Sequence, residues 1–317
     1  MANIAAMQTL ALGDSSLRIS RLGYGCWRLA GSGPVTSDVR AAGRRAIQAA
    51  IDAGFTLFDH ADIYGRGVCE EIFGEVMKES SALRERLVIA GKSGIRLPAA
   101  DGNGGPYRYD SRREHLITSC EASLRRLHVE TLDLYQIHRP DFLAPPEEIA
   151  AAFQHLVQAG KVREFGVSNF RPSQLTALQR VCPFKLCAHQ FECSLLQRAP
   201  LHDGTLDQCL AEKLIPLAWS PLGGGQLADR AGDLLRSQRE YQPERVLPLL
   251  DEIAARHATT RSVVALAWLL RHPARIVPII GTTDSARIIG AVQALVFELS
   301  PEDWYALLAA AEPAPLP

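Results

Sequence analysis

The feature that most constrains this chain is a regular alternation between short apolar runs and longer segments with helical periodicity. Eight runs have the length and composition of buried strands: 21–26, 55–61, 87–93, 132–138, 162–168, 185–191, 215–221 and 275–281. Helix-like segments lie between them at 37–53, 68–79, 111–127, 146–159, 172–180, 205–212 and 261–271. Strands that alternate with helices predict a parallel sheet joined by crossover helices.

Eight strand–helix units favour a closed (β/α)8 TIM barrel of the α/β class. An open doubly wound sheet remains possible on alternation alone, but it usually carries a G-x-G-x-x-G motif after its first strand, and none follows 21–26. Before the barrel, MQTLAL, the turn GDSS and LRISRL predict an N-terminal β-hairpin. After it, Trp304 and Leu307-Leu308 indicate an extra C-terminal helix. We expect one barrel domain spanning 1–317.

Charge and composition exclude several classes of partner. The 34 basic and 35 acidic residues are interspersed and give a net charge of −1, so neither nucleic acid nor an anionic membrane is an expected partner. No run reaches the ~18 apolar residues of a membrane span, and the first residues lack a signal-peptide pattern. Seven cysteines without C-x-x-C spacing predict free buried thiols and no metal site. A cytoplasmic enzyme fits best.

Charged residues interrupt two of the apolar runs near their ends. Asp59 lies in FTLFDHA and Lys92 lies in LVIAGKS, where a buried charge is tolerated only when it is paired. The carboxyl ends of the parallel strands of a barrel meet at one rim, so these two side chains are expected to form an ion pair there. A purely structural ion pair is the alternative interpretation.

Two further polar residues follow strands at the same rim. Tyr64 lies five residues after Asp59, in ADIYGRG, and His138 closes LDLYQIHRP. A nearby Lys92 ammonium would lower the pKa of the Tyr64 phenol from its usual value near 10, which makes the phenol a usable general acid. A packed tyrosine ring and a satisfied core histidine are the alternatives when each residue is taken alone.

Motifs spread over nearly the whole chain resemble those of the aldo-keto reductase family, and particularly its bacterial branch of poorly defined substrate. They are FDHADIYG, IAGKSG, LDLYQIHRP, GKVREFGVSNF, AHQFE, LAWSPLGGG and IIGTTDSARI, in this order. The resemblance implies that Tyr64 protonates a carbonyl oxygen while hydride arrives from a reduced nicotinamide. It also implies that Lys92 lowers the tyrosine pKa, that Asp59 holds the lysine, and that His138 orients the carbonyl group.

The same resemblance assigns a set of cofactor-binding residues. It places Ser168, Asn169 and Gln190 at the nicotinamide carboxamide and Trp219 against the ring, although polar residues at strand ends also cap helices. The other cofactor positions are Gly25 and Asp59, then Ser220, Leu222 and Gly224 at the pyrophosphate, and Thr282 and Arg287 at the 2′-phosphate. Because the planar guanidinium of Arg287 suits a phosphate, NADPH is the expected cofactor and NADH is less favoured.

The sequence defines the substrate only broadly. Tyr24, Trp27 and His138, with the loops 96–110 and 223–245, are expected to shape a pocket for a small aldehyde, ketone or sugar-like carbonyl compound. Two alternatives stay open: an NAD(P)-dependent dehydrogenase of a sugar or secondary alcohol, and a cofactor-binding, redox-sensing regulatory subunit. No oligomeric state is predicted, because no unpartnered apolar helix face stands out.

Overall fold

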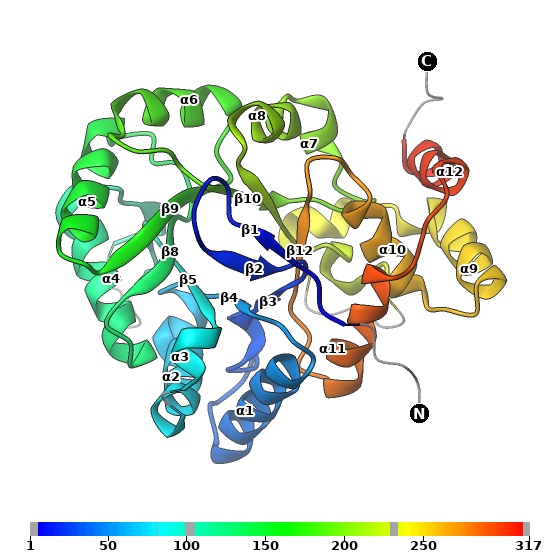
Figure 1. Ribbon diagram of the computed structural model, residues 1–317, viewed down its shortest axis with the longest axis horizontal. Coiled ribbons are helices and arrows are strands. Elements are labelled where there is room, and N and C mark those ends of the chain that lie inside the picture. The colour runs from blue at the N-terminus through cyan, green and yellow to red at the C-terminus, as the bar shows by residue number, and fades with distance from the viewer. Residues whose placement is uncertain (1–5, 81, 99–104, 229–233, 313–317) are drawn as a thin grey trace.

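The computed structural model describes residues 6–80, 82–98, 105–228 and 234–312, and within these ranges eight parallel strands close into a barrel (Figure 1). Neighbouring strands follow the order β10-β11-β12-β3-β4-β5-β8-β9. The strands are β3 (Gly23–Gly25), β4 (Leu57–Asp59), β5 (Val88–Ser93), β8 (Leu132–Ile137), β9 (Val162–Ser168), β10 (Ala188–Glu192), β11 (Ile215–Trp219) and β12 (Val277–Ile280). Each lies within one of the eight predicted runs or extends it by one residue, so the predicted TIM barrel is confirmed.

A layer of helices surrounds the barrel (Figure 1). The α-helices are α1 (Ser37–Asp52), α2 (Val68–Glu79), α3 (Leu83–Arg86), α4 (Arg113–Leu127), α5 (Pro146–Gln158), α6 (Pro172–Val181), α7 (Ala199–His202), α8 (Thr205–Glu212), α9 (Leu247–Arg256), α10 (Arg261–Leu270), α11 (Ser285–Ala291) and α12 (Pro301–Ala311). Short 3-10 helices are η1 (Cys26–Arg28), η2 (Tyr64–Gly67), η3 (Gly223–Gly225), η4 (Arg236–Glu240), η5 (Pro243–Arg245) and η6 (Val292–Leu295). The extra C-terminal helix is α12, whereas α9 was not predicted.

The N-terminal hairpin covers one end of the barrel. Strands β1 (Thr9–Ala11) and β2 (Arg18–Ser20) pair antiparallel, as predicted, and cross the barrel in Figure 1. Leu10, Leu12 and Ile19 are buried in one cluster with side chains from the barrel strands, among them Leu57 and Leu134. The hairpin therefore supplies the apolar floor of the barrel interior.

Alternation along each strand separates the barrel interior from the helix layer. On β8, Leu134 belongs to the interior cluster, whereas Tyr135 faces outward and donates a hydrogen bond to the carbonyl of Leu116 in α4 (2.8 Å). On β9, Phe165 packs outward with its ring centroid 4.2 Å from that of Phe153 in α5. The outer faces of the strands thus anchor the helices, and the inner faces are free to build a site at the rim.

Two loops after the barrel strands fall partly outside the described residues. In the loop 96–110, residues 99–104 lie outside them, and β6 (Ile95–Arg96) pairs antiparallel with β7 (Arg108–Tyr109) across that gap. In the loop 223–245, residues 229–233 lie outside them. Both loops therefore carry short ordered elements over the parts that are described.

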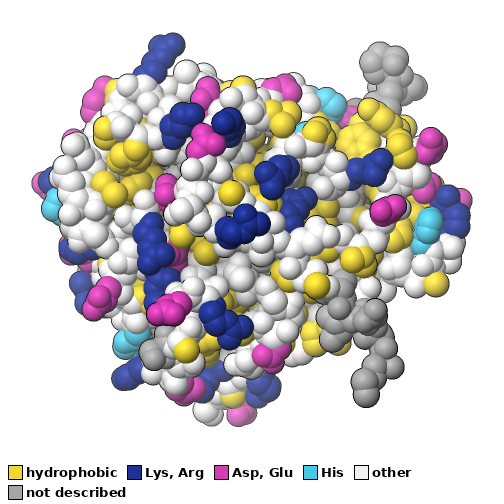
Figure 2. All heavy atoms as spheres, viewed as in Figure 1, with side chains coloured by type: hydrophobic (Ala, Val, Ile, Leu, Met, Phe, Trp, Pro, Cys, Tyr) yellow, Lys and Arg dark blue, Asp and Glu magenta, His cyan; other side chains and the backbone are white. Residues whose placement is uncertain are grey.

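The seven cysteines are free and buried, as predicted: Cys26, Cys69, Cys120, Cys182, Cys187, Cys193 and Cys209. Lysine and arginine side chains and acidic side chains are both spread over the face shown in Figure 2. Among the described residues, no helix is long and apolar enough to cross a membrane.

The packing of the N-terminal hairpin against the barrel interior leads to a prediction about stability. Ile19 is fully buried, so Ile19→Ala removes buried methyl groups and opens a cavity, and it should lower the free energy of unfolding by about 2–5 kcal/mol. Urea denaturation measures the change. Ser16→Ala, at an exposed position of the same hairpin, is the control and should change the value by less than about 0.5 kcal/mol. Equal effects of the two substitutions would contradict the role of the hairpin.

Candidate active site

A buried ion pair lies at the carboxyl end of two neighbouring strands. The Lys92 Nζ atom of β5 lies 2.6 and 2.7 Å from the two carboxylate oxygens of Asp59 at the end of β4. It also donates to the carbonyl of His60 (2.9 Å), so its three hydrogens all have partners. Gln190 of β10 donates to Asp59 Oδ1 (2.9 Å) from across the barrel. The predicted Asp59–Lys92 pair is therefore present and fixed from three strands.

The short helix η2 brings Tyr64 to this ion pair. Gly67 at the end of η2 has a left-handed φ of 95°, which favours glycine, and the chain turns there into α2. The Tyr64 ring centroid lies 5.1 Å from Lys92 Nζ and 5.9 Å from the ring centroid of His138. Four residues from three separate segments of the sequence, Asp59 with Tyr64, Lys92 and His138, therefore converge at one rim, as the strand ends predicted.

The pKa of Tyr64 moves in the direction opposite to the sequence-based expectation. Burial raises the pKa of Tyr64 well above the usual value of a phenol, and the negative charge of Asp59 raises it further. Lys92 does not offset this, because its charge is paired with Asp59 and all its hydrogens are engaged. Tyr64 is therefore a neutral phenol, which can donate its proton but does not ionise beforehand.

His138 is also neutral in this environment. Burial lowers the pKa of His138 well below its ordinary value, and the positive charges of Lys92 and Arg139 lower it further. Its backbone is fixed, since its N–H donates to Ser93 (2.8 Å) and its carbonyl accepts from Asn169 Nδ2 (3.1 Å). A neutral imidazole has one donor and one acceptor nitrogen, so it can orient a carbonyl group by a hydrogen bond.

The side chains assigned to the nicotinamide carboxamide form one network. Asn169, at a left-handed φ of 61°, donates to Ser168 Oγ (2.8 Å), and its Oδ1 accepts from Trp219 Nε1 (3.0 Å). Its amide thus joins the rims of β8, β9 and β11 and does not cap the following helix, α6. Gln190 links this network to the ion pair, because its carbonyl accepts from the backbone N–H of Asn169 (2.7 Å) and its side chain donates to Asp59 (2.9 Å).

The loop after β11 packs closely against Gln238. Gly224 in η3 has a φ of 70°, and a Cβ atom there would lie 2.6 Å from Gln238 Oε1. Gln238 is buried and donates to Ser220 Oγ (3.0 Å) and to Glu192 Oε1 (2.7 Å). Leu222 is partly buried against the core. Gln238 could not be predicted from the sequence, because only the fold brings η4, in which it lies, next to the end of β11.

The remaining cofactor positions lie around β3 and β12. Gly25 is the register partner of Asp59, so its backbone borders the ion pair. Thr282 follows β12, and its Oγ1 accepts from the backbone N–H of Asp284, which caps α11. Arg287 is exposed in the first turn of α11. Its guanidinium is thus open to solvent next to a helix N-terminus, where phosphates bind favourably.

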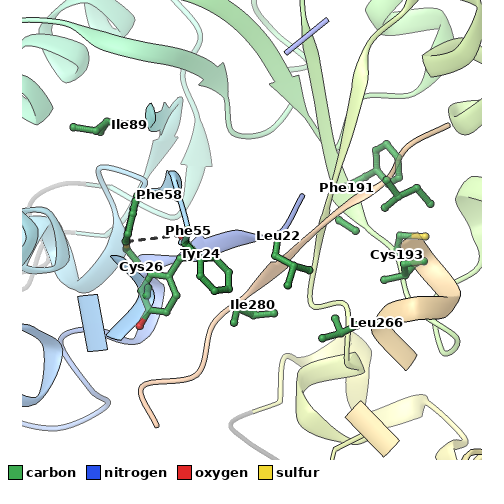
Figure 3. Close-up of a cluster of buried hydrophobic side chains, with 14 of the residues drawn as sticks. Leu22, Tyr24, Cys26, Phe55, Phe58, Ile89, Phe191, Cys193, Leu266 and Ile280 are labelled. Carbon is green, nitrogen blue, oxygen red and sulfur yellow. Dashed lines mark hydrogen bonds between the residues drawn. The ribbon is translucent and has the colours of Figure 1, made fainter. Parts of the chain in front are cut away.

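The assignment of Tyr24 to the substrate pocket is wrong. Its side chain is fully buried against Phe55 and Phe58, at ring-centroid distances of 6.4 and 5.7 Å (Figure 3). Its hydroxyl donates to the carbonyl of Thr282 (3.1 Å). On the three-residue strand β3, this side chain points to the helix layer. Trp27, by contrast, is 41% exposed, and its ring centroid lies 6.3 Å from that of Tyr64.

Two polar residues near the rim were not predicted. The Arg139 guanidinium lies 5.8 Å from the ring centroid of Trp219. Gln136 is fully buried in β8, two residues before His138. The motif LDLYQIHRP contains both residues, but a glutamine or arginine beside a histidine is too common to identify a site from sequence alone.

Comparisons with known proteins agree with this geometry. The model of the Aldo/keto reductase family matches residues 21–312, and the chain belongs to that family. The 6-dehydroglucose reductase of Novosphingobium aromaticivorans is 41% identical over 312 residues, which cover 96% of each chain. Oxidoreductase YdhF of Escherichia coli is 39% identical over 313 residues, which cover 96% of this chain and 98% of that protein. The protein is therefore an oxidoreductase of a family that reduces carbonyl groups.

Solved structures show the same architecture. The glycerol dehydrogenase AKR11B4 from Gluconobacter oxydans superposes with a TM-score of 0.84 at 29% identity, over 100% of this chain and 98% of its own. The thermostable aldo-keto reductase Tm1743 gives a TM-score of 0.81 at 29% identity, over 96% of this chain and 100% of its own. Both likenesses cover all or nearly all of the chain.

The residue after Asp59 generates a prediction about pH. His60 is fully buried, and burial, followed by the charge of Lys92, lowers its pKa to about 3. In the unfolded chain its pKa is about 6.5, so below that pH the unfolded state binds a proton that the folded state does not. Stability should therefore fall as the pH drops from about 6.5 towards about 3.

Replacing this histidine should reduce the sensitivity to acid. Between pH values of about 7 and 4.5, the decrease in Tm should be smaller for His60→Leu than for the parent, as measured by circular dichroism. His257→Leu, at an exposed position, is the matched control and should keep the decrease of the parent. The same acid sensitivity in all three proteins would show that His60 does not contribute.

Proposed function

We propose that this protein is an NADPH-dependent oxidoreductase that reduces an aldehyde or ketone to an alcohol, with Tyr64 as the general acid. The convergence of Tyr64 and a neutral His138 on the buried Asp59–Lys92 pair carries this proposal. A proton donor and a hydrogen-bond donor at one point are what the reduction of a carbonyl group requires.

The residues of the rim fit a nicotinamide cofactor. The amides of the half-buried Asn169 and the buried Gln190 can recognise a carboxamide, and the Trp219 indole, which donates to Asn169, offers an aromatic face beside them. The left-handed glycines of η3 permit the close backbone approach that a pyrophosphate needs. When bound, the reduced cofactor supplies the hydride, and the protein supplies the proton and the geometry.

In the proposed mechanism, each residue of the chain has a separate role. His138 donates a hydrogen bond to the carbonyl oxygen and holds it beside Tyr64. Tyr64 transfers its phenolic proton to this oxygen as negative charge develops there. The raised pKa of Tyr64 keeps the phenol protonated until that moment. Lys92 and Asp59 form an ion pair with no net charge beside the phenol. Because this pair is fixed, little reorganisation of the surrounding charges accompanies the proton transfer.

A sugar-like aldehyde is the proposed substrate class. Two relatives named 6-dehydroglucose reductase, from Novosphingobium aromaticivorans and Agrobacterium fabrum, are 41% and 38% identical to this chain. Trp27, which is exposed beside Tyr64, offers a face for the C–H groups of a sugar. The likeness to a glycerol dehydrogenase supports a second candidate, the oxidation of a polyol, which follows the same steps in reverse. Initial rates in both directions separate the two candidates.

The proposed role of Tyr64 as the general acid leads to the prediction of a large loss of activity when its hydroxyl is removed. Tyr64→Phe removes the acidic proton and keeps the ring, so kcat/KM for 4-nitrobenzaldehyde should fall by about 10²–10⁴-fold. Loss of NADPH absorbance measures the rate. Tyr305→Phe, on the exposed face of α12, is the matched control and should retain the activity of the parent. A Tyr64→Phe variant as active as this control would exclude the mechanism.

The position of Arg287 generates a prediction about cofactor choice. Arg287→Ala removes a charge-assisted hydrogen bond to the 2′-phosphate, so the Kd of NADPH should rise by about 10–100-fold. The Kd of NADH, which lacks that phosphate, should stay the same. Fluorescence titration measures both values, with Arg271→Ala as the control at another exposed arginine. If the affinity for NADPH does not change, Arg287 does not bind the phosphate.

A further inference from the structure

The residue that follows His138 places a positive charge at the rim of the barrel. Arg139 is half-buried, and the Cζ atom of its guanidinium lies 5.8 Å from the ring centroid of Trp219 at the end of β11. Its charge also acts on Tyr64 and on Tyr107, which precedes β7 and is 51% exposed. The guanidinium therefore lies near both the reacting groups and an exposed part of the rim.

This charge is not compensated by an ion pair, in contrast to two cations on the adjacent segments β5 and β6. Lys92 is paired with Asp59 (2.6 Å), and Arg96 is paired with Asp110 (3.0 Å). Over the part of the chain that the structure describes, the Arg139 guanidinium has neither an ion pair nor a hydrogen bond. Its N–H donors are therefore available to a ligand at the rim.

The charge of Arg139 also acts on a carboxylate at the end of β10, Glu192. Glu192 is the register partner of Trp219, and its Oε1 accepts from Nε2 of Gln238 (2.7 Å). Burial raises the pKa of Glu192, and among the described side chains it forms no ion pair with Arg139. Glu192 therefore leaves the guanidinium free to pair with a second anion.

We propose that Arg139 determines substrate specificity by binding an anionic group, a carboxylate or a phosphate, of an aldehyde whose carbonyl oxygen lies between Tyr64 and His138. The inference rests on the proposed function and narrows the sugar-like aldehydes to those that carry an acidic group. The planar fork of a guanidinium matches the oxygens of both groups. The contact with the Trp219 ring restricts the side chain before the substrate arrives, which lowers the entropic cost of binding.

Two aldehydes of similar size test the proposal. The substrate 4-carboxybenzaldehyde carries the charge, whereas methyl 4-formylbenzoate does not. In Arg139→Gln, the ratio of kcat/KM for the acid to kcat/KM for the ester should fall by about 10–100-fold, mainly through KM, because a charge-assisted hydrogen bond is lost. Glyceraldehyde 3-phosphate and glyceraldehyde make the same comparison for a phosphate. The pair whose ratio falls identifies the acidic group, and unchanged ratios for both pairs would overturn the proposal.

Two further variants and a cofactor titration control the experiment. Arg139→Lys keeps the charge and loses the planar fork, so its ratios should fall by less than those of Arg139→Gln. Arg171→Gln, at an exposed arginine after β9 on the same end of the barrel, should keep the ratios of the parent. Equal Tm values of all four proteins exclude unfolding as the cause. A tenfold rise in the Kd of NADPH in Arg139→Gln would assign the guanidinium to the cofactor and overturn the proposal.

Binding without turnover separates this proposal from the proposed function. Calorimetric titration with 4-(hydroxymethyl)benzoate, and with 4-(hydroxymethyl)benzamide as the neutral probe, measures the preference for an anion directly. If the parent reduces no aldehyde but binds the benzoate more tightly through Arg139, the proposed function fails and the anion site stands. If the parent is active but binds the two probes equally, and Arg139→Gln changes neither affinity, the anion site fails and the proposed function stands.

Discussion

The buried ion pair between Asp59 and Lys92 is the interaction on which the rim of the barrel depends. A lysine with no exposed side-chain area would be strongly destabilising without its carboxylate, and removing one partner of a buried pair typically costs about 3–5 kcal/mol. The pair joins β4 to β5, and Gln190 joins it to β10 on the other side of the barrel. The contacts that hold this rim together are therefore the same contacts that build the site.

Burial, more than any pairwise charge, sets the protonation states around this pair. It raises the pKa of Tyr64 and lowers the pKa values of His138 and His60, so all three side chains are neutral near pH 7. Formal charge is concentrated in one compensated pair, and neutral donors surround it. Such a site can bind a neutral carbonyl group without a prior change in the protonation of its side chains. This property suits a reaction in which negative charge develops only in the transition state.

The sequence predicted the fold well because each of its signals is local. The eight apolar runs contain the barrel strands except for the last residue of β10, and Asp59, Lys92 and His138 lie at or near the ends of these runs. The incorrect predictions concern properties that depend on the three-dimensional arrangement of the chain, namely the direction of a side chain and a pKa. Tyr24 was assigned to the wrong face, since a three-residue strand has too short a pattern to show its alternation. The pKa of Tyr64 was assigned the wrong direction, since neither its burial nor the engagement of Lys92 is visible in a linear motif.

The pairing of β3 with β12 has a consequence for folding. Gly23 is the register partner of Ile279, so the contact that closes the barrel joins the first strand of the ring to the last. During synthesis, the open edge of β3 stays without this partner until β12 (Val277–Ile280) has left the ribosome. Contacts between such distant segments are slow to form, and unpaired strand edges invite association with other chains. The barrel therefore closes late in synthesis, and until then β3 has an unpaired edge that can associate with other chains.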